Sequence, residues 1–219
     1  MGKLYGFLFE KETYIACFMI FAVLTGDIVA STDLGQAALD ETLVAIATAA
    51  DEIGTWPQVS VTGFARRGGD AWQMAFDAPW LSLRAALYVQ ACLRRLDRAR
   101  ASRIAIATGA GEMPGTDPNA AHGAAFTASG RLLDTLPAAL CLDHAAGGAE
   151  AAAARLADHI AQGWTEAQAR ALALQLPPGS GPRAEAATAL GISRQAVNQA
   201  LWSAGFPAII AALNALEAE

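Results

Sequence analysis

The chain has 219 residues, of which 54% are hydrophobic and 16% are charged, and its formal net charge is −6. This composition supplies ample apolar side chains for a buried core. The negative charge excludes a wholly basic protein that coats nucleic acid, although it leaves room for a local DNA-binding element. The three cysteines are odd in number, widely spaced and in no metal-ligand pattern, which indicates reduced thiols in a cytoplasmic protein.

The first 18 residues differ in composition from the rest. Both lysines, Lys3 and Lys11, lie there, whereas every Lys or Arg position from Met19 onward is an arginine. We therefore expect residues 1–18 to be a leader or the product of an upstream start codon, with Met19 as the natural start. The apolar stretch from Tyr14 to Leu24 has about 11 residues, too few to span a bilayer, so no membrane association is expected.

Apolar periodicity and turn residues predict alternating strands and helices in the first half of the chain. In chain order these are a strand over 20–29, a helix over 34–53 capped by Ser31-Thr32-Asp33, strands over 59–64 and 71–76, a helix over 80–96 and a strand over 103–109. The order β-α-β-β-α-β is that of a ferredoxin-like fold. We therefore expect an α+β domain of this kind.

Two aspartates occupy positions that suit a divalent cation. Asp27 closes the first apolar run, and Asp70 follows a glycine turn and opens the hairpin's second strand. In the expected topology the first strand lies beside a hairpin strand, so both carboxylates can share one site. Mg²⁺ takes one or two carboxylates from the protein and leaves its other positions to phosphates and water. The plain alternative is that Asp27 ends a strand and Asp70 occupies a turn, where Asp is common.

The second half of the chain is predicted to be mostly helical. A Gly/Pro loop over 111–119 precedes a helix over 121–136, a short strand over 140–144 and an Ala-rich helix over 149–160. We expect three parts: an α+β domain over 19–146, a linker helix over 147–163 and an all-α domain over 164–219. The basic cluster of Arg94, Arg95, Arg98, Arg100 and Arg103 is interpreted as a solvated helix end.

Four motifs of the first half resemble a known family. They are Gly26-Asp27-Ile28-Val29-Ala30-Ser31-Thr32, Gly69-Asp70 ahead of Met74-Ala75-Phe76, the segment from Arg103 to Gly109, and the segment from Gly123 to Arg131. In this order they resemble the cyclase homology domain of class III nucleotidyl cyclases and the related SatD-type bacterial proteins. The resemblance covers roughly residues 20–136.

The resemblance implies a site for a nucleotide with Mg²⁺ or Mn²⁺. Asp27 and Asp70 would hold the metal, and Arg131 would stabilise transition-state charge across a homodimer interface. The nucleotide-binding positions that it implies are Ile28, Ser31, Thr32, Arg66 and Gly69.

The sequence also departs from the cyclase pattern at several positions. Thr127 stands where the family has an Asn, Arg66 where it has a base-selecting Lys, and Ala120 where it has a base-selecting Asp. The late Lys that grips the triphosphate has no counterpart. Each lost group typically costs about 10²–10³ in rate, so we expect nucleotide binding rather than efficient turnover.

Residues 187–197 have the spacing of a helix-turn-helix. Ala187 allows close helix crossing, Gly191 suits the turn, and Val197 packs the second helix onto the first. Ser193 would cap that helix and leave an exposed set of base-reading side chains, namely Arg194, Gln195, Asn198 and Gln199. The pattern resembles the helix-turn-helix of bacterial regulators, and SatD-type proteins end similarly. DNA contact is expected through residues 182–204; a helical hairpin for protein interaction is the alternative.

These features together predict a homodimeric, cytoplasmic transcriptional regulator. Its degenerate cyclase-like domain would sense a nucleotide and a metal ion, and its helix-turn-helix would bind DNA. Two alternatives remain open: an active metal-dependent nucleotidyl cyclase that converts ATP or GTP to a cyclic nucleotide and carries a regulatory helical tail, and a protein-interaction module built on an inactive cyclase fold.

Overall fold

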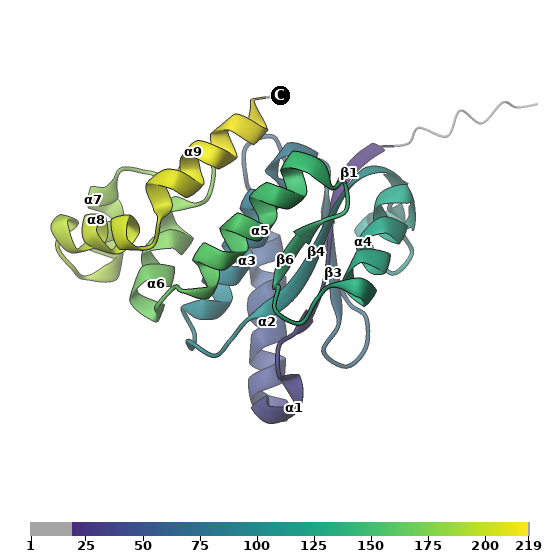
Figure 1. The fold of residues 1–219 in the computed structure, drawn as a ribbon, viewed down its shortest axis with the longest axis horizontal. Coiled ribbons are helices and arrows are strands. Elements are labelled where there is room, and N and C mark those ends of the chain that lie inside the picture. The colour runs from purple at the N-terminus through teal and green to yellow at the C-terminus, as the bar shows by residue number, and fades with distance from the viewer. Residues whose placement is uncertain (1–18, 219) are drawn as a thin grey trace, which may run out of the picture.

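The computed structural model describes residues 19–218, which form a mixed α/β region followed by a helical C-terminal region (Figure 1). The strands are β1 (Met19–Ile28), β2 (Thr62–Arg66), β3 (Trp72–Phe76), β4 (Ser102–Glu112), β5 (His122–Gly123) and β6 (Leu142–His144). The α-helices are α1 (Ser31–Leu34), α2 (Gln36–Ile53), α3 (Ser82–Arg94), α4 (Ala124–Thr135), α5 (Gly148–Gln162), α6 (Glu166–Gln175), α7 (Arg183–Leu190), α8 (Arg194–Ser203) and α9 (Phe206–Glu217). Two short 3₁₀ helices, η1 (Pro79–Leu81) and η2 (Pro114–Thr116), precede α3 and β5.

The strands form one sheet in the order β2-β3-β1-β4-β5, antiparallel throughout this path, and β6 adds to β4 in parallel. Gly26 of β1 lies opposite Trp72 of β3, and Asp27 lies opposite Arg103 of β4. The end of β1 therefore lies next to the start of both neighbouring strands, which places Asp27 and the β2–β3 turn at the same end of the sheet.

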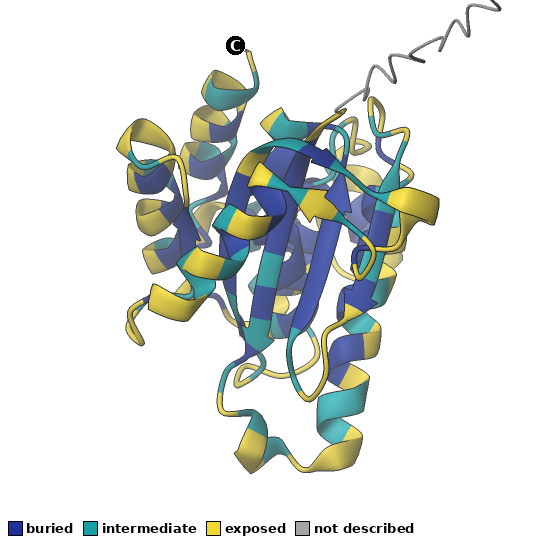
Figure 2. Ribbon diagram, turned by 90° about the vertical axis from the view of Figure 1, so that its right-hand side faces the viewer, coloured by how far each residue is buried: buried dark blue, intermediate teal, exposed yellow. Residues whose placement is uncertain are grey.

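Each face of the sheet is covered by helices. Side chains alternate along β1 as a pleated strand requires: Leu24 contributes to the core formed with α2 and α3, whereas Phe21 and Val23 contribute to a smaller core under α4. The Phe21 and Phe126 rings lie 5.8 Å apart in that smaller core. Figure 2 shows the strands as the most buried part of the molecule, with exposed residues on the outer sides of the helices.

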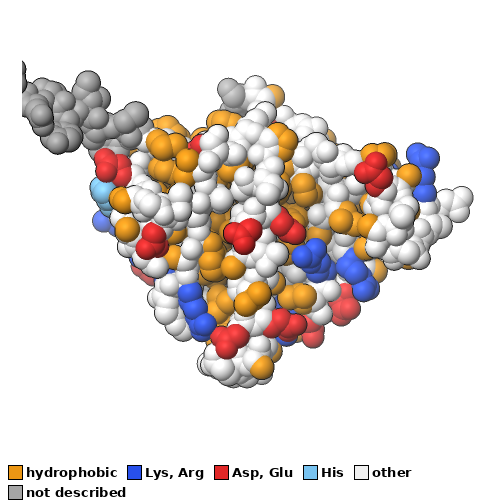
Figure 3. Space-filling model, turned by 180° about the vertical axis from the view of Figure 1, so that it is seen from behind, with side chains coloured by type: hydrophobic (Ala, Val, Ile, Leu, Met, Phe, Trp, Pro, Cys, Tyr) orange, Lys and Arg blue, Asp and Glu red, His pale blue; other side chains and the backbone are white. Residues whose placement is uncertain are grey.

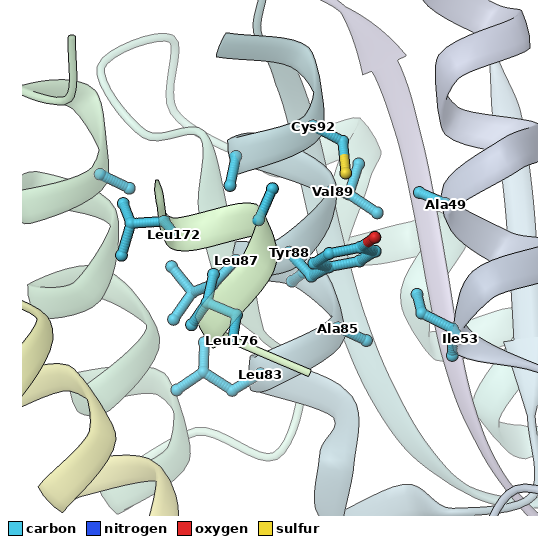
Figure 4. Close-up of a cluster of buried hydrophobic side chains, with 14 of the residues drawn as sticks. Ala49, Ile53, Leu83, Ala85, Leu87, Tyr88, Val89, Cys92, Leu172 and Leu176 are labelled. Atoms are coloured by element: carbon cyan, nitrogen blue, oxygen red, sulfur yellow. The ribbon is translucent and has the colours of Figure 1, made fainter. Parts of the chain in front are cut away.

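The helix α3 is buried along nearly its whole length. Its residues from Ser82 to Leu93 are all buried, because α2 covers one side of it and α5 and α6 cover the other. In Figure 4, Leu83 and Leu87 lie toward Leu172 and Leu176 of α6 and its C-terminal end, while Tyr88 lies toward α2. A single hydrophobic core thus runs from the sheet through α3 into the C-terminal helices.

A buried arginine ties the C-terminal helices to α3. Arg84 is 4% exposed and donates two hydrogen bonds to the Glu217 carboxylate, at 2.7 and 2.8 Å. It also donates to the carbonyl oxygen of Leu176 at 2.8 Å and to Asn214 Oδ1 at 3.2 Å. The charged group therefore has a partner for each of its donor nitrogens inside the core.

The predicted elements appear in the predicted order, although α1 and β5 were not predicted and the boundaries differ by a few residues. The expected strand over 59–64 begins only at Thr62, and the expected helix over 80–96 is divided into η1 and α3. The Ser31-Thr32-Asp33 cap is wrong: these residues form the separate turn α1, and α2 starts after Gly35, whose φ is 71°. The expected leader over 1–18 lies outside the described residues.

Within residues 19–218 no single helix is both long enough and apolar enough to cross a membrane. The helices α8 and α9 pass that test only as a pair, and they meet at an angle of 69°.

Candidate functional site

Asp27 forms a two-pronged ion pair with Arg103 across the β1–β4 ladder. Arg103 Nε donates to Asp27 Oδ1 at 2.9 Å, and its terminal nitrogen donates to Oδ2. The backbone of Asp27 is fixed too, because Ser102 Oγ donates to its carbonyl oxygen at 2.6 Å while accepting from Trp72 Nε1 at 2.9 Å. Both carboxylate oxygens of Asp27 thus accept hydrogen bonds from the Arg103 guanidinium.

Asp70 lies in the β2–β3 turn at the same end of the sheet. The preceding glycines Gly68 and Gly69 have φ values of 89° and 54°, a conformation that a side chain would strain. Arg66 closes this turn by donating from Nε to the Gly69 carbonyl oxygen at 2.8 Å, and it pairs with Asp40 of α2 at 3.0 Å. The predicted nucleotide-binding residues Arg66 and Gly69 therefore belong to one locally bonded turn.

The negative charges of Asp27 and Asp70 both raise the pKa of Arg103. The hydrogen bonds and charge of Asp27 raise the pKa of the Arg103 guanidinium, burial opposes them, and the negative charge of Asp70 adds a smaller contribution in the same direction. The sheet therefore places the two predicted metal ligands at the same end, where Arg103 pairs with Asp27. The signal that sequence reasoning missed is the cross-strand register, which pairs Arg103 with Asp27.

The carboxylates of Asp27 and Asp70 are suitable ligands for a metal ion, but the present arrangement does not leave Asp27 free to bind one. A hard cation would need carboxylate oxygens that Asp27 already gives to Arg103. Among residues 19–218 there is no group of three or more His, Cys, Asp or Glu side chains placed to hold a metal. Metal binding by Asp27 and Asp70 thus stays a prediction, and it requires Arg103 to leave Asp27.

The other predicted residues of this site are spread over three elements. Ile28 is buried in the core, Ser31 lies half-buried at the start of α1, and Thr32 is exposed there. Thr127 and Arg131 lie one turn apart on the exposed side of α4, whereas Ser129 faces the sheet. Arg131 is therefore open to solvent.

A chain of polar side chains under α4 was not predicted. Arg67 donates to Gln73 Oε1 at 3.0 Å, Gln73 donates to Thr25 Oγ1 at 2.8 Å, and Thr25 and Ser129 share a hydrogen bond of 2.7 Å. This chain leads from the β2–β3 turn into the interface between β1 and α4. It links the turn that carries Asp70 to the helix that carries Arg131.

The helices α7 and α8, which carry the predicted helix-turn-helix, are joined by a short turn at the end of the molecule remote from α4 (Figure 1). Gly191 adopts the left-handed conformation (φ 65°), and the Ile192 amide donates to the Ala187 carbonyl at 3.1 Å, which ends α7. Ser193 Oγ accepts from the Ala196 amide at 3.1 Å and caps α8. Val197 is fully buried, as predicted.

The predicted DNA-reading residues occupy the outer side of α8. Arg194, Gln195 and Gln199 are exposed, whereas Asn198 is half-buried and its Oδ1 accepts from Arg183 at 2.9 Å. Trp202 follows one turn later and is 76% exposed. On the face shown in Figure 3, acidic and basic side chains are interspersed rather than gathered into a basic stripe.

In comparisons with known proteins, no family model matches the chain and no curated protein matches its sequence. The resemblances to cyclase homology domains and to bacterial helix-turn-helix regulators therefore rest on the residues themselves.

Proposed function

We propose that the chain is a DNA-binding transcriptional regulator whose α8 enters the major groove. The observation that carries this proposal is the first part of α8: a capped helix start on a glycine turn, anchored by buried Val197, with Arg194, Gln195 and Gln199 free on the outside. Arg, Gln and Asn side chains are the ones that pair with guanine and adenine edges. A rigid anchor under exposed polar groups keeps their positions fixed for such pairing.

Arg183 and Asn198 extend this surface onto α7. Their hydrogen bond of 2.9 Å orients the Asn198 amide and holds a guanidinium beside the start of α8. In a complex Arg183 would contact a phosphate, and Asn198 would contact a base edge. Residues 164–219 carry three arginines (Arg170, Arg183 and Arg194) against four glutamates (Glu166, Glu185, Glu217 and Glu219), so the net charge of this region is −1. We therefore expect modest affinity per subunit and dependence on a homodimer.

We further propose that the sheet region is a ferredoxin-like, cyclase-like domain that senses a nucleotide in the cytoplasm. The strand order β2-β3-β1-β4 and the position of Asp27, Asp70 and Arg103 at one end of the sheet support this. The burial of α3 supports coupling of this domain to the helices that follow, because a shift of α3 would disturb the one core that both share.

Selection from random DNA followed by gel shift tests the proposal. The wild type should enrich a paired sequence motif, and Arg194→Ala should lower its affinity by roughly 1–3 kcal/mol, in keeping with one base contact. Arg98→Ala, which removes the same charge from the exposed segment after α3, is the matched control and should keep wild-type affinity at moderate salt. A folded protein that enriches no motif, or equal losses in both variants, would refute sequence-specific binding through α8.

Protein interaction is the second candidate, and exposed apolar residues of the same surface favour it. Trp202 is 76% exposed and Ile192 is 44% exposed, one at each end of α8. Trp202→Ala separates the two functions: a protein interface would lose most of its affinity with this residue, since exposed tryptophans are typical anchors. DNA binding through the start of α8 would persist.

A further inference from the structure

An apolar groove runs between α5 and α9, with α3 as its floor. Its volume is about 440 Å³, and every residue that lines it is an alanine, a leucine or an isoleucine. Leu83 and Leu87 of α3 form the floor, and Ile209 and Leu213 belong to the α9 wall. The rim is open to solvent, since Leu156 of α5 is 69% exposed. A contiguous exposed apolar surface of this kind normally marks a contact with another molecule.

The helix α9 is apolar on its solvent side as well as on its buried side. Its two polar residues, Asn214 and Glu217, both bond to Arg84. Four exposed alanines follow one another at the i, i+3, i+4, i+7 spacing of a single helix side, at positions 208, 211, 212 and 215. A helix that is apolar all round is normally buried. The outer side of α9 therefore has the composition of an interface rather than that of a free surface.

The extent and shape of this surface favour a second protein chain over a small molecule. A small molecule in the groove would leave Ala211 and Ala215 uncovered, since both are exposed and neither lines the groove. The protruding Leu156 side chain lies on the rim of the groove, so an apolar group and a hollow that can receive it are neighbours on one surface. A two-fold symmetric contact needs this combination, because the same surface of each subunit must fit its own copy.

The position of α8 is compatible with such a dimer. In Figure 1, α5 and α9 lie in front of α3, whereas α7 and α8 lie at the left-hand end of the molecule. A two-fold axis that passes in front of the groove and points toward that end would place both α8 helices on the same side of the dimer. Helix-turn-helix proteins contact paired half-sites in this way.

We propose that the groove and the outer side of α9, together the α5–α9 surface, bind the same surface of a second copy of this chain. The choice of a second copy rests on the proposed DNA binding, which depends on a pair of α8 helices. The dimer differs from the one that the cyclase resemblance implies, because α4 packs on the opposite face of the sheet. Arg131 of α4 would then lie away from the partner subunit's Asp27.

Sedimentation equilibrium of the full chain at micromolar concentration tests the proposal. The wild type should be a dimer. Leu156→Glu should raise the dimer dissociation constant by roughly 100-fold, because each dimer would bury two carboxylates without partners in place of two apolar anchors. Val44→Glu is the matched control, since Val44 is likewise an apolar helix residue, 64% exposed on α2. Val44→Glu and Arg131→Glu should both leave the dissociation constant unchanged.

Cysteine cross-linking keeps the test decisive if Leu156→Glu fails to fold. A short bismaleimide should join two copies of Leu156→Cys and should leave Val44→Cys at the wild-type level. A monomeric wild type would overturn the proposal. Equal effects of the changes at Leu156 and Val44, or a dimer that Arg131→Glu dissociates, would overturn it too.

The failure of this interface can be told from the failure of DNA binding. A dimer that behaves as expected but enriches no DNA motif would refute the proposed DNA binding and leave the α5–α9 surface as the interface. A monomeric wild type that still selects a DNA motif would overturn the interface alone.

Discussion

The Arg84–Glu217 pair allows a quantitative test of how the last helix is held. Arg84→Met keeps most of the side-chain volume and removes the guanidinium. Glu217 then loses two hydrogen bonds of 2.7 and 2.8 Å, and the Leu176 carbonyl loses its 2.8 Å donor from the side chain. Removing one partner of a buried ion pair costs about 3–5 kcal/mol. The Glu217 side chain is 16% exposed and can regain some water, so we expect a loss near the lower limit, about 3 kcal/mol.

The double variant Arg84→Met/Glu217→Met gives the sharper comparison. Because it leaves no buried charge without a partner, its free energy of unfolding should lie within about 1 kcal/mol of the wild type and above that of Arg84→Met alone. Arg66→Met is the control for an exposed pair, since the Arg66 and Asp40 side chains are 42% and 48% exposed. It should lose no more than about 1 kcal/mol.

Urea unfolding followed by circular dichroism measures these differences, provided that the slope against urea concentration stays constant among the variants. Two results would refute the reasoning. One is a loss of less than about 1 kcal/mol in Arg84→Met, which would mean that the pair is effectively solvated. The other is a double variant as unstable as the sum of its single changes, which would mean that the charges do not interact.

Three further predictions concern the other sites. Arg103→Leu frees both Asp27 oxygens, so Mn²⁺-dependent binding of ATP or GTP, measured by calorimetry, should strengthen several-fold, while Asp70→Ala should abolish it. No change in either variant would remove the metal hypothesis. Formation of cyclic nucleotide at enzyme-like rates would contradict our expectation of weak catalysis. Val197→Asp should unfold the α7–α8 region, seen as lost amide-exchange protection there, because it buries an unpaired charge; retained protection would contradict the packing. Burial lowers the pKa of His144 from 6.5, so the unfolded chain takes up this proton first and the free energy of unfolding should fall as pH drops below about 6.5. His144→Asn keeps an acceptor for the Ala146 amide and should flatten that part of the pH dependence; an unchanged profile would assign it to other groups.

Much of the sheet could be predicted from local patterns. The apolar run over 20–29 predicted β1 (Met19–Ile28) almost to the residue, because a buried strand needs continuous apolar side chains and is ended by the turn at Ala30. The glycine turn before Asp70 predicted the hairpin for a similar reason, since Gly68 and Gly69 both have positive φ. The sequence likewise predicted the turn glycine and the helix cap between α7 and α8, at Gly191 and Ser193.

Long-range pairing could not be predicted in this way. Arg103 was interpreted as part of a solvated basic cluster, yet it pairs with Asp27, because its surroundings depend on strand register rather than on neighbours in sequence. The sequence did not predict the buried ion pair of Arg84, because its partners Leu176 and Glu217 lie about a hundred residues away in the chain. The groove between α5 and α9 was missed for the same reason: its lining comes from three separate helices.

The complete burial of α3 bears on how the chain folds during synthesis. On the ribosome the sheet strands up to β4 emerge long before α6 and α9, which cover Leu83 and Leu87. Until translation is nearly finished, α3 would present an apolar surface to solvent, and such surfaces attract chaperones or other nascent chains. A truncation after α5 should for this reason yield an aggregation-prone protein rather than a free-standing sheet domain.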